Sequence, residues 1–284
     1  MRLDDAPESD NVEDQRGMGS KLAIGGAGGV VLLILGLIFG VDFGGGQPRP
    51  AVNNAPPDHK TEVFAKKVLG TLEKVWQVQF EKHHREYKVA WAPPKLVLFT
   101  AEVRTGCGTA PSAVGPFYCP ADKHVYLDPT FFDELEQRLG GSKAAFSQAY
   151  VIAHEVGHHV QNLLGYSSRV DEHRGKRDEK QYSVRLELMA DYLAGVWAHD
   201  AEEKFHVIEP GDVKAAITSA NAIGDDKLQK RSGGFVHPEK FTHGTSRQRI
   251  HFFEQGLKTG DASKATLDKF FEAKIQPNGE IEDF

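Results

Sequence analysis

Two histidines four residues apart, with a glutamate directly after the first, are the side chains best suited to chemistry in this chain. They are His154, Glu155 and His158. In an α-helix, residues i and i+4 lie on one face, so both imidazoles could bind a single metal ion. Glu155 lies about a quarter turn away, within reach of a water on that metal. This H-E-x-x-H spacing is typical of a Zn²⁺ site with a glutamate as general base.

The residues around the motif favour this interpretation over a helix with two ordinary polar histidines. The run Ala149–Ala153 is apolar and precedes the motif directly, which predicts a buried helix from about Ser142 to Leu164. A glutamate buried in such a helix without a partner would be costly, whereas a metal ion with its ligands would supply one.

A pair of acidic residues further along the chain could complete the site. Glu187 and Asp191 stand four residues apart in an apolar segment, Gln181 to Trp197, that is predicted to be helical. Two carboxylates in such a helix need a cationic partner, which zinc and its histidines could provide. Glu187 can then be the third metal ligand, while Asp191 can accept the outer N–H of a ligand histidine and fix its tautomer. The alternative is an acid pair that faces solvent.

These motifs together resemble a known family. The pattern His-Glu-x-x-His followed by Glu-x-x-Ala-Asp resembles the gluzincin metallopeptidases, and several further motifs extend the likeness over nearly the whole chain. They are a glycine-rich N-terminal segment, Cys-Gly…Tyr-Cys-Pro, Tyr-Leu-Asp and Phe-Thr-His-Gly-Thr-Ser. The layout is similar to the bacterial putative neutral zinc metallopeptidase family. The resemblance implies a protein or peptide substrate, Glu155 as base, and one Zn²⁺ per chain held by His154, His158 and Glu187.

A third histidine is a candidate for the catalytic site by analogy with gluzincins. His243 lies in Phe241–Ser246, between a glycine and hydroxyl residues and just before a predicted helix. It could donate a hydrogen bond to the oxyanion that develops on the substrate. The alternative is a helix-capping loop with Thr245 or Ser246 as N-cap, and both roles are compatible. Arg247 and Arg249 are weaker candidates.

The two cysteines of the chain, Cys107 and Cys119, are expected to form a disulfide. Their spacing does not suit a zinc site, which needs more ligands nearby. A disulfide requires an oxidising compartment, and two unrelated buried thiols are the alternative.

The first fifty-eight residues predict three segments. Residues 1–21 are polar and acidic, which is typical of a disordered tail. Residues 22–42 predict a transmembrane helix, since Leu22 to Val41 carries no charge and would span about 30 Å as a helix. Its glycines could support a homo-oligomer. Residues 43–58 predict a flexible linker. Arg16 and Lys21 weakly favour a cytoplasmic N-terminus, which would place the catalytic domain on the periplasmic side of a bacterial inner membrane.

Residues 59–284 are predicted to form one zinc metallopeptidase domain. Helical periodicity runs from His59 to Tyr87, and two strands are predicted at Lys95–Thr100 and His124–Asp128. Short helices are expected at Phe131–Leu139 and Asp212–Ala222. The predicted fold class is therefore α+β: a mainly helical zincin-like domain with a small sheet before the active-site helix, plus one N-terminal transmembrane helix.

Composition limits the classes of function. The net charge is −6 and basic residues are spread among acidic ones, so nothing indicates nucleic-acid binding. The leading hypothesis is a membrane-anchored zinc endopeptidase. Two alternatives are a non-catalytic, zinc-stabilised scaffold and a zinc hydrolase of a non-peptide amide such as cell-wall material. Glu155 argues against the scaffold, because a purely structural zinc site needs no base.

Overall fold

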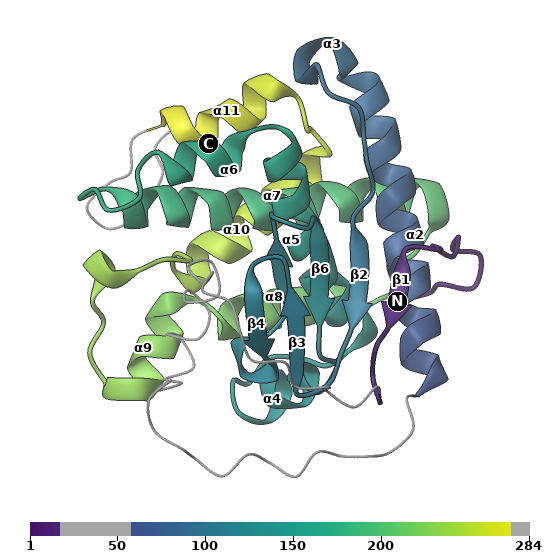
Figure 1. Cartoon of the computed structure of the whole chain (residues 1–284), viewed down its shortest axis with the longest axis horizontal. Helices are drawn as coiled ribbons and strands as arrows, with labels where there is room; N and C mark the ends of the chain where they lie inside the picture. Colours follow the sequence, from purple (N-terminus) through teal and green to yellow (C-terminus); the bar gives the residue numbers. More distant parts are fainter. Residues whose placement is uncertain (18–57, 274–284) are drawn as a thin grey trace.

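A small sheet lies against a set of packed helices in this computed structural model, which describes residues 1–17 and 58–273 (Figure 1). The four-stranded sheet has the order β1-β2-β6-β5, in which β5 alone runs antiparallel. Its strands are β1 (Val12–Asp14), β2 (Lys95–Leu98), β6 (His124–Leu127) and β5 (Phe117–Cys119). A separate antiparallel hairpin consists of β3 (Glu102–Thr105) and β4 (Gly108–Pro111).

The helices of the core pack behind the sheet (Figure 1). α5 (Ala145–Leu163) contacts the sheet through β5 and β6, and it packs on α7 (Glu179–Phe205), which in turn packs extensively on α10 (Ser246–Thr259). The long α2 (His59–Lys82) packs on both α5 and α7. The remaining helices are α3 (His84–Tyr87), α4 (Phe131–Gln137), α6 (Tyr166–Asp171), α8 (Asp212–Ala222), α9 (Asp225–Gly233) and α11 (Lys264–Glu272).

Most elements predicted from periodicity are present close to the expected bounds. The predicted helix at 59–87 is α2 followed by the short α3, and the metal-motif helix is α5. The predicted strands at 95–100 and 124–128 are β2 and β6, which pair in parallel with Val97 opposite Tyr126. The prediction of a mainly helical α+β domain, with a small sheet before the active-site helix, is confirmed.

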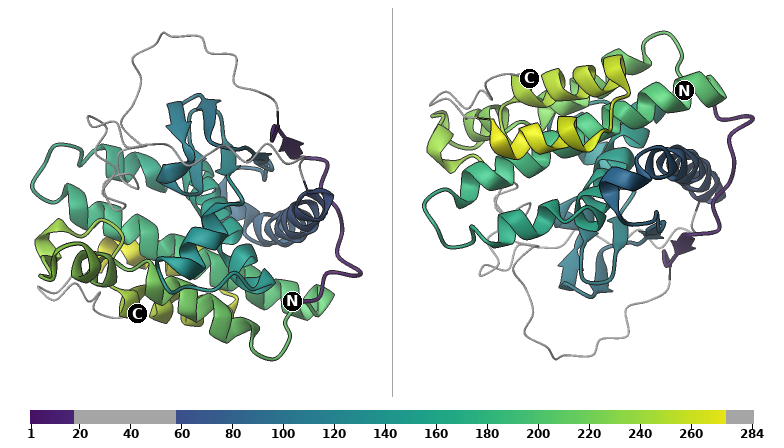
Figure 2. Two further views of the ribbon diagram at one scale, coloured as in Figure 1. Left: turned by 90° about the horizontal axis from the view of Figure 1, so that it is seen from below. Right: turned by 90° about the horizontal axis from the view of Figure 1, so that it is seen from above.

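The N-terminal tail is not disordered in its described part, so that prediction is wrong for residues 1–17. β1 extends the sheet in parallel with β2, with Val12 opposite Leu96. Ser9 donates a hydrogen bond to the Glu73 carboxylate on α2 (2.7 Å), and the Arg2 backbone N–H bonds Val207 (2.9 Å). Figure 2 shows this segment running across α2 to the edge of the sheet. Backbone pairing, which does not depend on an apolar composition, outweighs the polar character of this segment.

The predicted transmembrane helix must also be corrected. Within residues 1–17 and 58–273, no helix is both long and apolar enough to cross a membrane. The predicted span at 22–42 and nearly all of the linker at 43–58 lie outside the described residues. β1 precedes the predicted span and β2 follows it, so a single crossing would place them on opposite sides of a bilayer. They are instead hydrogen-bonded neighbours.

Two glycines allow α7 and α10 to cross with their backbones in contact. A Cβ atom on Gly195 would lie 2.2 Å from the Phe253 carbonyl oxygen, and one on Gly256 would lie 2.0 Å from that of Tyr192. Cβ atoms cannot approach other atoms so closely, so any larger residue would force the helices apart. The close crossing fixes the position of α10 relative to the acidic residues of α7.

We therefore expect Gly256→Ala to destabilise the fold by about 1–3 kcal/mol, the usual cost of overpacking a close-packed interior. Gly233→Ala is the matched control, because nothing lies within 4 Å of its added methyl group and Gly233 ends helix α9. Urea unfolding of both variants measures the difference in free energy. Equal stability of the two variants would contradict the close crossing.

Candidate metal centre

The metal-motif residues and the downstream acidic pair come together where α5 and α7 approach closely. Gly157 on α5 lies against Ala190 on α7, and a Cβ atom at Gly157 would meet the Ala190 carbonyl oxygen at 3.1 Å. This small residue allows the helices to approach closely. His154 and His158 flank Gly157 and face α7, where Glu187 lies one turn from Asp191.

Three side chains converge on one point, as the sequence predicts. Nε2 of His154 lies 3.2 Å from Oε2 of Glu187, and Nε2 of His158 lies 3.5 Å from Oε1 of the same carboxylate. One ligand atom from each of the three residues lies within 4.8 Å of the others. The side chains are 8%, 15% and 14% exposed for His154, His158 and Glu187, so the cluster opens to solvent. Two imidazoles and one carboxylate fit Zn²⁺ with a position left for water.

Each ligand histidine has its other ring nitrogen engaged, which directs Nε2 toward the metal position. Nδ1 of His154 lies 2.9 Å from Oδ1 of Asp191, and Nδ1 of His158 lies 2.9 Å from Oε1 of Gln161. Because both partner atoms are hydrogen-bond acceptors, both histidines carry their proton on Nδ1 when neutral. Asp191 thus has the position of an outer hydrogen-bond partner of a metal ligand, on the side of the His154 ring away from Glu187. Such partners orient a ligand ring and raise its basicity.

The Asp191 carboxylate is completely buried and accepts hydrogen bonds from two other helices, α5 and α10. Besides His154, it accepts from the Tyr150 hydroxyl (2.5 Å) on α5. It also accepts from Nε and Nη2 of Arg249 on α10, at 2.8 and 3.0 Å. The fork of the guanidinium holds both carboxylate oxygens at once, a geometry that fixes the orientation of Asp191 as well as neutralising its charge.

Charge in the cluster favours a bound cation. Burial raises the pKa of Glu187, but His243, His158 and His154 outweigh it, so its pKa lies well below the usual range. Burial lowers the pKa of His154, but Asp191 and Glu187 outweigh it and raise the value to about 10. Burial likewise lowers the pKa of His158 to about 4. The raised pKa of His154 reflects the negative charge of Asp191 and Glu187, which would also attract a divalent ion, and the neutral His158 keeps a nitrogen lone pair free to bind it.

Glu155 lies in a different environment from Glu187. It is buried, and burial is the main cause that raises its pKa to about 8, with the nearby Glu187 charge adding to the rise. The backbone N–H of Tyr118 on β5 hydrogen-bonds it and acts in the opposite direction. A carboxyl group with a pKa close to neutrality can both accept and return a proton, which is the property required of a general base.

His243 is buried and belongs to a loop organised by Asp225. The Asp225 Oδ2 atom accepts from the backbone N–H groups of Thr242 (2.7 Å), His243 (2.7 Å) and Gly244 (3.1 Å). The Coulomb interaction with His243 lowers the pKa of Glu187, so His243 is part of the electrostatic surroundings of the metal cluster. The expected N-cap is also present: Thr245 and Gln248 form a reciprocal capping box at the start of α10.

The other histidine of the motif has a structural role. His159 lies within hydrogen-bond distance of the Tyr118 hydroxyl through Nδ1 (3.0 Å) and of the Ala92 carbonyl through Nε2 (2.7 Å). Burial lowers its pKa to about 4, so it stays neutral. With both ring nitrogens engaged away from Glu187, it is not available as a fourth metal ligand.

The expected disulfide between Cys107 and Cys119 is formed, and it links the β3–β4 hairpin to β5.

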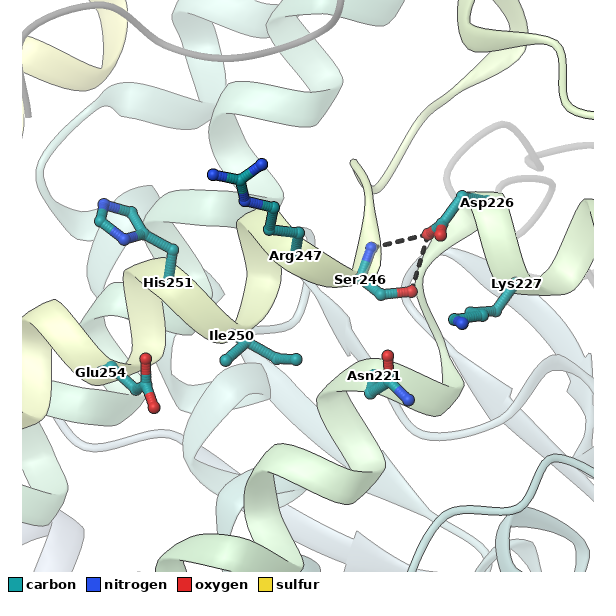
Figure 3. A pocket seen from close by; sticks show the side chains of 8 residues that line it. All are labelled: Asn221, Asp226, Lys227, Ser246, Arg247, Ile250, His251 and Glu254. Carbon is teal, nitrogen blue, oxygen red and sulfur yellow. Dashed lines mark hydrogen bonds between the residues drawn. The ribbon is translucent and has the colours of Figure 1, made fainter.

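The metal centre does not lie in the cleft along α10. A cleft of about 420 Å³ lies along α10, where Ser246, Ile250 and Glu254 face residues of α8 and α9 (Figure 3). Asp226 is bonded there to the Ser246 backbone and hydroxyl. None of His154, His158 and Glu187 lines this cleft. The metal centre is therefore identified by its three ligand side chains and not by a cleft.

The sequence did not predict the roles of three residues in the site. Gln161 is the partner of His158, and Tyr150 and Arg249 are partners of Asp191. The spacing of Gln161, three residues after His158 on the same helix face, could have indicated its role. Tyr150 likewise precedes His154 by one helical turn. Arg249 is separated from Asp191 by fifty-eight residues. Nothing in the sequence pattern pairs the two, because their proximity depends on how α10 crosses α7.

The fold and the site define a helical zinc-peptidase-like domain, and comparison with known sequences gives its family. The sequence profile described as putative neutral zinc metallopeptidase matches residues 1–270. The chain belongs to this family, whose name implies zinc as the metal and peptide hydrolysis as the activity.

Two relatives show how far the similarity extends. A protein of Escherichia coli strain K12, described as uncharacterized protein YpfJ, is 42% identical over 285 residues, or 93% of this chain and 97% of that protein. The uncharacterized protein Mb2605 of Mycobacterium bovis is 45% identical over 177 residues, or 59% of this chain and 60% of its own length. No solved structure matches the chain.

Loss of the Gln161 side chain should weaken metal binding. We expect Gln161→Ala to lower zinc affinity by about ten- to a hundredfold, because the His158 ring loses the acceptor that orients it. Gln148→Ala on the same helix is the control, since the Gln148 side chain hydrogen-bonds the Lys143 carbonyl oxygen at the start of α5. Competition with a chromophoric chelator measures both affinities. Unchanged affinity in Gln161→Ala would mean that His158 needs no orienting partner.

The Asp225 loop should have a characteristic dependence on pH. Burial raises the pKa of Asp225, but His243 and the loop N–H groups outweigh it, so the folded-state pKa is depressed. A depressed carboxyl pKa stabilises the fold above the unfolded value and loses that contribution as pH falls through the folded value. We expect Asp225→Asn to cost about 1–3 kcal/mol at pH 7 and progressively less below about pH 4. Urea unfolding across this range tests it, and a constant difference would contradict the assigned shift.

Proposed function

We propose that this protein is a zinc-dependent endopeptidase in which Glu155 is the general base. The observation that carries the proposal is the position of a buried glutamate, with its pKa raised to about 8, beside two imidazoles and a carboxylate that converge on one point. A zinc ion held by His154, His158 and Glu187 would supply a polarised water and an electrophile for the substrate carbonyl.

The residues of the chain would divide the work of peptide hydrolysis. Glu155 accepts a proton from the attacking water and returns it to the leaving amine. His243, close to Glu187, donates a hydrogen bond to the developing oxyanion. Asp191 and Gln161 hold the two ligand rings in orientation from their Nδ1 atoms. Arg249 keeps Asp191 ionised within the core.

The position of β5 supports an extended peptide as substrate over a small amide. β5 is the terminal strand in the sheet order, and the backbone N–H of its central residue, Tyr118, interacts with the Glu155 carboxyl group. A peptide in extended conformation could add to such a strand through main-chain hydrogen bonds, which would place a scissile bond beside the base. A small non-peptide amide would gain nothing from this strand.

A non-catalytic zinc scaffold is the weaker alternative. A structural zinc site closes its fourth position with another protein ligand and has no use for a buried base. Here His159 has both nitrogens engaged elsewhere, and Glu155 is kept buried at a cost in desolvation.

The test separates catalysis from metal binding. We expect Glu155→Gln to retain zinc while cleavage of an unstructured protein such as casein falls by about 10²–10⁴-fold, the usual contribution of a general base. His243→Ala should retain zinc and lose activity, mainly in kcat. Zinc content and proteolysis are measured on the same preparations. A fully active Glu155→Gln variant would rule out the proposed mechanism, and inactive wild type with bound zinc would favour the scaffold.

We also propose that the domain functions in an oxidising compartment, on the basis of the Cys107–Cys119 disulfide. The bond anchors β5, so it helps to hold the Tyr118 N–H against Glu155. We expect neither cysteine to react with iodoacetamide in unreduced cell fractions, whereas both should react after reduction. Mass spectrometry of the labelled peptides measures this. Labelling of both thiols without reduction would contradict the proposed location.

A further inference from the structure

A second group of potential metal ligands lies about a dozen residues beyond Glu187 on α7, roughly 18 Å away along the helix axis. It consists of His199, Asp200 and Glu203, whose ligand atoms lie within 4.8 Å of one another. No part of the proposed peptidase site uses these residues. The group is near the ends of α2 and α10, so it lies where three helices meet.

The His199 ring is oriented as a metal ligand would be. Its Nδ1 atom lies 2.9 Å from the Leu257 carbonyl oxygen near the end of α10, which therefore accepts the Nδ1 proton. This leaves the Nε2 lone pair directed at the carboxylates, with Oε1 of Glu203 at 3.5 Å. The arrangement repeats, with a backbone carbonyl in place of Asp191, the way in which His154 is fixed at the first centre.

A buried amide oxygen without a partner points to a missing ligand at this position. Gln79 on α2 is only 2% exposed, and its Nε2 atom donates to Oδ2 of Asp200 (2.7 Å) and to the Gly260 carbonyl (3.3 Å). Its Oε1 atom is buried and has no hydrogen-bond partner. Buried amide oxygens are almost always satisfied, so this one requires an explanation.

Gly260 brings the Gln79 amide and the His199 ring together. It has a positive φ of 57° at the C-cap of α10, and a Cβ atom there would lie 2.8 Å from Nε2 of His199. Only glycine permits both the backbone conformation and the approach of the ring. The Gln79 side chain, which carries the unpartnered oxygen, thus lies at the same small cluster as the imidazole.

The electrostatics of the cluster favour a cation. Burial raises the pKa of Asp200, and the charge of Glu203 raises it further, while His199 and Lys82 lower it. The C-terminal end of α10 adds the partial negative charge of its free carbonyl groups. One imidazole with carboxylate and amide oxygens suits a borderline divalent metal such as Zn²⁺ better than Ca²⁺, which prefers a shell of oxygen ligands alone.

We propose that His199, Asp200 and Glu203, with the Gln79 amide oxygen, form a second divalent-metal site that ties together the ends of α2, α7 and α10. The site is separate from the peptidase centre. Its role is structural: by fixing the far end of α7, it limits movement of the helix that carries Glu187 and Asp191.

Zinc stoichiometry of the full chain tests this proposal. After equilibration with Zn²⁺ at buffered micromolar concentrations, wild type should bind two ions. Glu203→Gln and His199→Ala should each bind one. The Glu203 side chain is 72% exposed, so its substitution leaves the fold intact even if His199→Ala does not. His84→Ala removes an exposed imidazole near the same end of α2 and should still bind two ions.

A further variant separates the two sites. Glu187→Gln should retain the ion that depends on Glu203, so failure of the proposed peptidase centre would not resemble failure of this site. A zinc titration should show that Glu203→Gln lowers affinity for this second ion at least tenfold. The proposal is overturned if wild type and Glu203→Gln bind equal numbers of ions, or if the second ion binds only at millimolar zinc.

Discussion

The buried carboxylate of Asp191 is the interaction on which the rest of the site depends. It has no exposure to solvent, yet it accepts hydrogen bonds from Tyr150 and His154 on α5 and from Arg249 on α10. Removal of one partner from such a buried pair usually costs about 3–5 kcal/mol, because the other charge remains uncompensated. The network therefore couples metal geometry to folding: α5, α7 and α10 can satisfy Asp191 only in the arrangement that also directs Nε2 of His154 at Glu187.

Close helix packing makes this arrangement accessible. Gly157 allows α5 to approach Ala190 on α7, while Gly195 and Gly256 allow α10 to cross the other side of α7. Side chains that are only a few ångströms long can then bridge three helices. The sheet adds one further constraint, because the N–H of Tyr118 on β5 hydrogen-bonds Glu155 and so positions the base next to the terminal strand.

The parts of this structure that sequence could predict are those with a local signal. The metal-motif helix, the acidic pair on α7 and the strands β2 and β6 all follow from periodicity within a few residues. β1 and the β3–β4 hairpin were missed because they are short, and β1 consists of Val-Glu-Asp in an acidic segment. Its pairing with β2 depends on backbone groups that composition does not reveal. The same pairing contradicts a single membrane crossing between β1 and β2, which length and lack of charge alone suggest.

Long-range partners were the other limit of sequence reasoning. The pairing of Arg249 with Asp191 depends on a helix crossing, and the proximity of Gln79 to His199 depends on the packing of α2 against α7. Neither leaves a spacing pattern in the chain. By contrast, the partner of His158 is only three residues away, so helix geometry alone could have indicated it.

Anomalous diffraction at the zinc absorption edge, from crystals of the full chain grown with zinc, tests the proposed metal ligands directly. We predict an anomalous peak about 2.0–2.2 Å from Nε2 of His154, Nε2 of His158 and a carboxylate oxygen of Glu187, with Asp191 outside the coordination sphere. A peak bound directly by Asp191, or the absence of zinc from these three residues, would contradict it.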